Sequence, residues 1–299
     1  MRLQKSKFKR VLGGALVAVL TVGLVAGCGI TPEKKEAVTP TGNKTVNIGV
    51  VNWADDVAVS YLWKVLLEEK GYDVNLRTLE IAPVFVGLNK GDLDLYLDAW
   101  LPITHQAYWD KYKAELDDYG VWYTSDAKMG LVVPKYMENI NSVEELNANK
   151  AKFDSKINGI NPGAGLMKAT NNAIKDYGLD LELIQSSEAA MMTALDKAYR
   201  EKKSIVITGW SPHWMFAKYD LKYLEDSKKI FGEAEKIHTL ANKKFTKSNP
   251  EIVKMLKAFK FDEQQMGDVE SLINEGMEPE AAAKKWIEDN RDLADSWIK

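Results

Sequence analysis

The chain has 299 residues, of which 45% are hydrophobic and 28% are charged, and its formal net charge is −3. This composition is ordinary for a soluble globular protein, and the slightly acidic balance gives no basic field of the kind that binds nucleic acid. We therefore expect no nucleic-acid partner. One cysteine and three histidines are also too few for a disulfide framework or a Cys/His metal cluster.

The N-terminal 28 residues have the pattern of an export signal. Residues 1–10 contain five basic residues and no acid, and residues 11–25 contain no charge. A basic head followed by a short apolar stretch is typical of a secretory signal, and this stretch is shorter than the ~20 residues of a membrane span. The sequence Val25-Ala26-Gly27-Cys28 resembles the bacterial lipobox. That resemblance implies a signal peptide over residues 1–27 and an acylated Cys28; the alternative is an uncleaved anchor helix with an incidental cysteine.

Residues 28–44 contain almost no large apolar side chains, so we expect a flexible tether between the lipid and a globular body. The chain from residue 45 onward is long enough to bury a large core and to form more than one lobe. With Cys28 lipidated, no thiol remains for nucleophilic catalysis or metal binding.

The globular part begins with a strand, a helix and a strand, predicted over residues 45–51, 57–70 and 72–79 from β-branched content and helical spacing. This order favours a parallel sheet with crossover connections, so we expect an α/β fold. Further strands are predicted over residues 92–98, 129–133, 156–160, 204–208 and 237–241, and helices over residues 83–90, 166–177 and from 250 to the C-terminus.

Catalytic motifs are missing from the sequence. It contains no nucleophile elbow, phosphate-binding Walker loop or zinc-protease motif. His105, His213 and His238 lie far apart and show no metal-ligand spacing. We therefore predict no catalytic residue, no metal and no cofactor.

Two groups of aspartates have ordinary structural interpretations. Asp92, Asp94 and Asp98 alternate with leucines, which indicates the solvated face of a half-buried strand more than a carboxylate site. Asp55 and Asp56 precede a predicted helix, where acids at the N-terminus are stabilising.

Three of the nine tryptophans share an unusual context. Trp53, Trp100 and Trp210 each lie just beyond a predicted strand, in a loop that is expected to line a cleft. The carboxyl ends of parallel strands are where α/β folds bind ligands. Other tryptophans fit ordinary core positions, within a strand or on the apolar face of a helix, namely Trp63, Trp109, Trp286 and Trp297. The pattern favours a ligand-binding box of indole rings.

Indole faces attract a quaternary ammonium, which offers no N–H group for hydrogen bonding. Each desolvated face contributes roughly 0.5 to 2 kcal/mol. Three faces therefore contribute about 2 to 6 kcal/mol, whereas micromolar affinity needs about 8 kcal/mol. A carboxylate at the other end of the ligand is the natural source of the remainder.

Two features could bind such a carboxylate. The segment Asn161-Pro-Gly-Ala-Gly165-Leu166 leads directly into a predicted helix, whose free N-terminal amides bind anions; a plain tight turn is the alternative. His105, five residues after Trp100, could donate a hydrogen bond, although a capping or surface histidine is the ordinary interpretation.

The motifs together resemble the glycine betaine/proline betaine-binding lipoproteins of osmoprotectant ABC importers over essentially the whole mature chain. The matching segments are Val51-Asn-Trp53-Ala-Asp, Asp98-Ala-Trp100-Leu-Pro-Ile-Thr-His105, Gly130-Leu-Val-Val-Pro134, Pro162-Gly-Ala-Gly165 and Gly209-Trp210-Ser-Pro-His-Trp214.

The resemblance implies a two-lobed type II periplasmic-binding-protein fold, with lobe 1 over residues 45–133 and 237–299 and lobe 2 over residues 134–236. It implies a cage of Trp53, Trp100 and Trp210 around a trimethylammonium group. It also implies carboxylate contacts from His105 and from the backbone amides of Gly165 and Leu166. His213 and Trp214 match the family's loop, and we expect them to support the loop without touching ligand.

The implied partners are a small betaine, an ABC permease with its ATPase, and the membrane through the N-terminal lipid. Three other functions stay open. A choline- or carnitine-binding protein would use the same cage, but choline has no carboxylate for His105. An enzyme acting on methylated amines would need a base, metal or cofactor near the cage. A sensor domain would need a partner chain, because we expect no output module after Lys299.

Overall fold

A computed structural model describes residues 44–299 of the chain. The predicted signal peptide, Cys28 and the tether up to residue 43 lie outside the described residues. The first sheet has the strand order β2-β1-β3-β10-β4. β1 (Thr45–Val50) pairs in parallel with β2 (Asp73–Thr78) and β3 (Leu95–Leu101), while β10 (Lys236–Asn242) is antiparallel to β3 and to β4 (Leu116–Val121).

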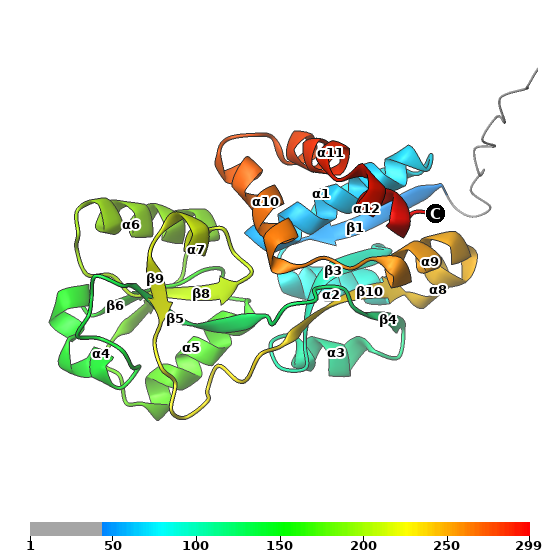
Figure 1. Cartoon of the computed structure of the whole chain (residues 1–299). Helices are drawn as coiled ribbons and strands as arrows, with labels where there is room; N and C mark the ends of the chain where they lie inside the picture. The colour runs from blue at the N-terminus through cyan, green and yellow to red at the C-terminus, as the bar shows by residue number, and fades with distance from the viewer. Residues whose placement is uncertain (1–43) are drawn as a thin grey trace, which may run out of the picture. The chain divides into compact units, whose positions relative to one another are not determined.

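Helices cover the first sheet, and with it form what we call the first lobe (Figure 1). α1 (Ala54–Glu69) follows β1 and α2 (Ile81–Lys90) follows β2, as the strand–helix–strand prediction requires. Gly91 ends α2 with a φ of 82°, a left-handed conformation that glycine adopts without strain. The remaining helices of this lobe are α3 (Gln106–Tyr112), α8 (Lys243–Ser248), α9 (Pro250–Ala258), α10 (Glu263–Asn274), α11 (Pro279–Asp289) and α12 (Arg291–Trp297).

The C-terminal helices pack on the first lobe because they bury an aromatic cluster against α1. α10 and α11 contact α1 directly. Trp286 and Trp297 stack at 6.0 Å between ring centroids, and Phe259 and Phe261 pack edge-on against them. The core assignments of Trp63, Trp286 and Trp297 are confirmed, and Trp109 is partly buried against the same core.

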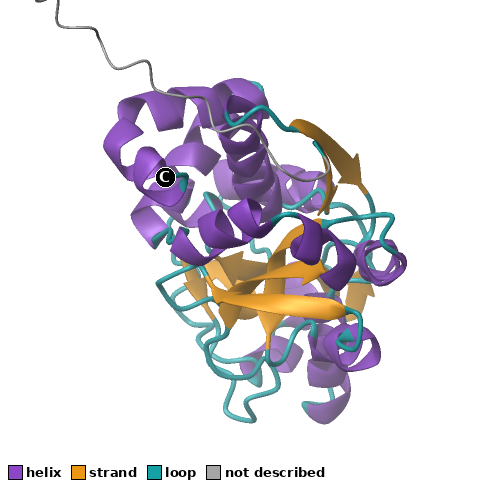
Figure 2. Ribbon diagram, turned by 90° about the vertical axis from the view of Figure 1, so that its right-hand side faces the viewer, coloured by secondary structure: helices purple, strands orange, loops and turns teal. Residues whose placement is uncertain are grey.

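The second sheet has the order β7-β6-β8-β5-β9 and forms the second lobe with its own helices (Figure 1). In Figure 2 the first lobe faces the viewer, with helices above and below its strands. Its strands are β5 (Lys128–Pro134), β6 (Lys156–Asn158), β7 (Glu182–Ile184), β8 (Ile207–Ser211) and β9 (Leu221–Tyr223). Its helices are α4 (Glu145–Ala148), the 3-10 turn η1 (Lys150–Phe153), α5 (Gly165–Asp176), α6 (Glu188–Arg200) and α7 (Met215–Lys218). The two mixed sheets confirm the predicted α/β class.

The predicted lobe boundaries differ from the sheet pairing at one place. β5 lies within the predicted first lobe up to residue 133, but it pairs with β8 and β9 of the second sheet. The chain therefore crosses between residues 122 and 127, and it returns between residues 224 and 235, close to the expected position. The apolar sequence of β5 identifies a buried strand but carries no information about its partner strands.

The strand predicted over residues 92–98 also differs. β3 begins at Leu95 and its seven residues are all buried, because it lies between β1 and β10. The interpretation of Asp98 as part of a solvated face is therefore wrong, since this side chain is 0% exposed. The same interpretation is wrong for Asp94, just before β3, which is 8% exposed and accepts hydrogen bonds from the backbone and side chain of Asn47, whereas Asp92 is exposed as expected.

Candidate functional site

One pocket of the described structure contains all six residues that the sequence nominates for ligand binding. Its lining includes Trp53, Trp100, His105, Gly165, Leu166 and Trp210. It encloses about 320 Å³ of space not occupied by atoms, part of it open to solvent. Because some of these residues belong to the first lobe and others to the second, the pocket lies between the two lobes.

The three tryptophans reach the pocket from the carboxyl ends of three strands. Trp53 follows β1 and precedes α1, whereas Trp100 and Trp210 lie within the last residues of β3 and β8 and not in loops beyond them. The Nε1 of Trp100 donates to Asp98 at 2.7 Å, and the Nε1 of Trp210 donates to Asp55 at 3.1 Å. These hydrogen bonds fix the orientation of both indole rings.

His105 is a neutral hydrogen-bond donor in this pocket. Burial lowers the pKa of its imidazole to about 3, so the ring is uncharged at neutral pH. Its Nδ1 accepts a hydrogen bond from the backbone N–H of Trp100 at 2.9 Å. The proton must therefore reside on Nε2, which is buried without a partner among the described residues. The ring also stacks on Trp53, with 6.2 Å between centroids.

The N-terminus of α5 forms another part of the wall. Gly165 and Leu166 are the first two residues of this helix, and their amides have no acceptor within it. A Cβ at Gly165 would lie 2.5 Å from the Cγ2 and 2.6 Å from the carbonyl oxygen of Thr104, in the first lobe. Glycine is therefore required for this close approach of the lobes.

Glu235 holds the segment that carries Thr104. Its carboxylate accepts hydrogen bonds from the backbone amides of Ile103 at 2.7 Å and Thr104 at 2.9 Å, and from the Thr104 hydroxyl. Glu235 is buried and lies in the chain that returns to the first lobe. The segment that positions Thr104 is thus anchored to the connection between the lobes.

Buried carboxylates lie behind the tryptophans. Asp55, Asp56 and Asp98 are all buried, and no Lys or Arg ion pair is found for them among the described residues. Burial, followed by the nearby Glu188 carboxylate, raises the pKa of Asp55 to about 6. Burial also raises the pKa of Asp98 well above its usual range. A buried acid without a basic partner favours a cationic ligand.

Residues 44–289 match the family described as the substrate-binding domain of ABC-type glycine betaine transport systems. The chain belongs to this family. It is 48% identical over 144 residues to the glycine betaine/carnitine transport binding protein GbuC of Listeria monocytogenes, a match that spans 47% of this chain and 48% of that protein. The alignment thus covers about half the length of the Listeria relative. Identity to the glycine betaine/proline betaine-binding periplasmic protein of Salmonella typhimurium is 24% over 277 residues, or 78% and 82% of the two chains.

Solved structures of the glycine betaine family have the same fold. Lactococcal OpuAC, closed and complexed with glycine betaine, matches with a TM-score of 0.79 and 41% identity, covering 85% of this chain and 99% of that chain. ProX from Borrelia burgdorferi matches at 0.81 and 29%, covering 85% and 97%. A choline-binding protein in complex with choline matches at 0.79 and 26%, covering 86% and 92%. The predicted two-lobed type II fold is confirmed.

Five further residues line this pocket and were not predicted from the sequence. They are Asp55, Thr104, Met129, Ile160 and Ala164. Asp55 had a usable signal, because it lies two residues after Trp53 and the first turn of α1 returns it to the pocket. The apolar members had none, since Met129 and Ile160 look like any other core residues. Over residues 44–299, no cluster of metal-ligating side chains occurs, and no helix has the length and apolarity to cross a membrane.

Proposed function

We propose that this chain binds glycine betaine, or the closely related proline betaine, and delivers it to an ABC importer for osmoprotection. The observation that carries the proposal is the chemical polarity of one pocket. Three tryptophans and the acid Asp55 provide for a cation, while the neutral His105 Nε2 and the first amides of α5 provide for a carboxylate. A betaine carries both groups.

In this proposal Trp53, Trp100 and Trp210 surround the trimethylammonium group by cation–π attraction. His105, Gly165 and Leu166 bind the carboxylate by hydrogen bonds. The relatives named for glycine betaine support this assignment, including the lactococcal protein with that ligand bound. The chain acts as a binding protein without catalysis, because its chemistry is complete when both charges of the ligand are paired.

Ligand contacts from both lobes also make closure part of the function. A ligand that touches both lobes favours the closed state by its differential affinity for that state. The permease and ATPase of the importer can then distinguish loaded from empty protein by the spacing of the lobes. We expect betaine to lower the radius of gyration of the protein in small-angle scattering.

Choline is the second candidate, favoured by the similarity to a choline-binding protein. Calorimetric titration of the purified chain with glycine betaine, proline betaine, carnitine and choline tests the proposal. We expect the carboxylate-bearing betaines to bind most tightly. Tighter binding of choline would assign the pocket to a ligand without a carboxylate, and no binding of any of the four would refute the proposed function.

We further propose that Cys28 is acylated and holds the protein on the extracytoplasmic face of the cell membrane after removal of residues 1–27. The lipobox-like sequence and the absence of any other cysteine support this anchor. Cys28→Ser is expected to release the protein from the membrane while ligand binding is retained. Membrane fractionation after lysis without detergent measures this, and retention of a correctly processed Cys28→Ser protein would contradict lipid anchoring.

A further inference from the structure

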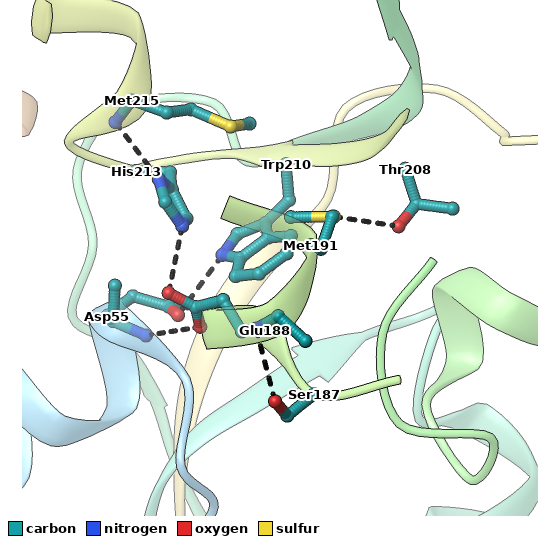
Figure 3. A network of polar contacts seen from close by, with 10 residues as sticks. Asp55, Ser187, Glu188, Met191, Thr208, Trp210, His213 and Met215 are labelled. Carbon is teal, nitrogen blue, oxygen red and sulfur yellow. Dashed lines mark hydrogen bonds and ion pairs between the residues drawn. The ribbon is translucent and has the colours of Figure 1, made fainter. Parts of the chain in front are cut away.

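A second contact between the lobes lies beside the pocket and does not line it. The Oε2 of Glu188, in the second lobe, accepts a hydrogen bond from the backbone N–H of Ala54, in the first lobe, at 3.0 Å. The Oε1 of the same carboxylate lies 3.1 Å from the Nε2 of His213. Figure 3 shows the Glu188 carboxylate between His213 and the start of α1. We call Ala54, Glu188 and His213 the clasp.

Local structure places each partner of the clasp. Ala54 is the first residue of α1, so its N–H has no acceptor within that helix. Glu188 is the first residue of α6, whose N-cap Ser187 accepts from the amide of Ala190 at 3.2 Å. His213 accepts the amide hydrogen of Met215 on Nδ1 at 3.0 Å. Its Nε2 therefore carries the ring proton and donates a hydrogen bond to Glu188.

We propose that Glu188 and His213 are positioning residues that hold the two lobes together over the bound ligand. This inference rests on the proposed function, because it concerns the closed state of the same site. Neither residue lines the ligand pocket. Both are buried. If the lobes separated, the Glu188 carboxylate would keep its hydrogen bond from His213, in the same lobe, and lose the one from Ala54 across the cleft.

The clasp is connected to the tryptophan cage at two points. The His213 ring meets Trp210 edge-on, with 4.6 Å between centroids. Ala54 lies between Trp53 of the pocket wall and Asp55, which accepts the cross-lobe hydrogen bond of Trp210. Movement of the clasp therefore moves the residues that surround the ligand.

The charges around the clasp oppose closure without a cation. Burial raises the pKa of Asp55 most, and the nearby Glu188 carboxylate raises it further. Burial, followed by Asp55 and Glu188, also raises the pKa of Glu270. Closing the lobes thus gathers like charges. A quaternary ammonium in the pocket beside Asp55 offsets this repulsion, so the clasp closes most favourably when the proposed ligand is bound.

Two substitutions remove the cross-lobe hydrogen bond from opposite sides. Glu188→Ala deletes the acceptor. Ala54→Pro deletes the donor at a position where proline suits a helix, because Ala54 is the first helical residue and Trp53 before it is extended, with φ −113° and ψ 148°. The proline ring would also meet the Glu188 carboxylate. Glu201→Ala, at the exposed opposite end of α6, is the matched control.

The test measures betaine affinity and dissociation rate in the full chain by calorimetry and stopped-flow fluorescence. Hydrogen bonds to charged groups predict a loss of affinity of about tenfold or more for Glu188→Ala and for Ala54→Pro. We expect most of it in faster dissociation. Ala54→Pro should add little in the Glu188→Ala background, because both act on one contact. His213→Phe, which keeps a ring against Trp210, should resemble Glu188→Ala.

A second readout separates this inference from the proposed function. Inter-lobe distance, measured by fluorescence transfer between labels on α6 and α11, should shift toward open conformations in Glu188→Ala but not in Glu201→Ala. A folded Glu188→Ala or Ala54→Pro protein with wild-type affinity and wild-type inter-lobe distance would overturn the proposal that the clasp holds the lobes together. Additive losses of affinity in the protein carrying both substitutions would overturn it as well. Absence of betaine binding by the wild-type chain would overturn the proposed function. The inter-lobe distances of Glu188→Ala and Glu201→Ala would still show whether the clasp holds the lobes together.

Discussion

The strand ends that carry Trp100 and Trp210 are built alike but use their histidines differently. In each, an indole Nε1 donates to a buried aspartate, and a proline and then a histidine follow in the chain. In each, the histidine Nδ1 accepts a backbone amide, which leaves the proton on Nε2. The Nε2 of His105, a residue that lines the pocket, has no partner within residues 44–299, whereas the Nε2 of His213 donates a hydrogen bond to Glu188. In the proposed function, one loop presents a donor to the ligand, whereas the other uses the same donor to position Glu188, which joins the lobes through Ala54.

The aspartates that hold the two indoles differ as well. Asp98 lies on the same strand as Trp100, so this hydrogen bond exists whether the lobes are open or closed. Asp55 belongs to the first lobe and Trp210 to the second, so this hydrogen bond requires both lobes. The comparison indicates that the Trp100 side is preformed and that the Trp210 side is completed on closure.

The largest expected difference separates Trp210→Ala from Trp100→Ala. Each loses one aromatic face, worth roughly 0.5 to 2 kcal/mol. Trp210→Ala also loses a cross-lobe hydrogen bond to a carboxylate, worth about 1.5 to 3 kcal/mol. We therefore expect a loss of betaine affinity of about 100-fold for Trp210→Ala and about tenfold for Trp100→Ala, measured by calorimetry.

Phenylalanine sharpens this comparison, because it keeps a ring and removes only the indole N–H. Trp210→Phe should weaken betaine binding more than Trp100→Phe does. Trp286→Ala, in the C-terminal helices, is the control, and should lower stability without changing the affinity of the folded protein. Equal affinities of Trp210→Phe and Trp100→Phe for betaine would contradict the inference that the Trp100 side is preformed and the Trp210 side is completed on closure.

The next effect concerns the free donor of His105. His105→Phe keeps the ring that stacks on Trp53 and removes the Nε2–H. We expect glycine betaine to bind about tenfold or more weakly, from the loss of a hydrogen bond to a carboxylate, at about 1.5 to 3 kcal/mol. Choline, which has no carboxylate, should lose much less. An equal loss for both ligands would show that His105 shapes the pocket and does not bind the carboxylate.

The sequence predicted the parts of the site that depend on residue type and chain position. Tryptophans at strand ends and a glycine before a helix are local signals, and all six nominated residues line one pocket. Contacts between distant segments had no such signal. The pairing of Trp210 with Asp55 joins residues 155 positions apart, and that of Ala54 with Glu188 joins residues 134 apart. Taken alone, the acidic side chains of Asp55 and Glu188 are typical of a helix N-terminus.

The same limit explains the two fold differences. β5 is an apolar strand that either sheet could have accepted, and its partners β8 and β9 lie far along the chain. Residues 92–98 alternate leucine with polar residues like a half-buried strand, yet β3, which begins at Leu95, is central in its sheet and buried along its whole length. Hydrophobic period indicates that a strand exists but not its place in the sheet.

A smaller effect is expected from Gly165→Ala, which tests closure without removing a ligand contact. The added Cβ would overlap the Cγ2 and carbonyl oxygen of Thr104 across the cleft. Overpacking of this kind costs about 1 to 3 kcal/mol, so affinity should fall about fivefold or more. Gly163→Ala is the matched control, because its Cβ would find its nearest neighbour at 3.7 Å. Equal calorimetric affinities for the two variants would contradict the close approach of the lobes.

The smallest expected effect tests whether His105 is neutral, as its role as a donor from Nε2 requires. The folded pKa of about 3 lies below the usual value of 6.5. The unfolded chain therefore takes up a proton at His105 near pH 6.5 that the folded protein does not. The stability from this group is complete above pH 6.5 and falls as the pH falls, by about 0.7 kcal/mol between pH 7 and pH 6.

Asp55, with its raised pKa of about 6, contributes a stability change of the opposite sign over this interval, so the pH dependence of the wild type alone is not diagnostic. The difference between wild type and His105→Phe cancels the Asp55 contribution. Urea unfolding at the two pH values should show the wild type losing about 0.7 kcal/mol more than His105→Phe, and an identical loss in both proteins would mean that His105 is protonated as readily in the folded state as in the unfolded one.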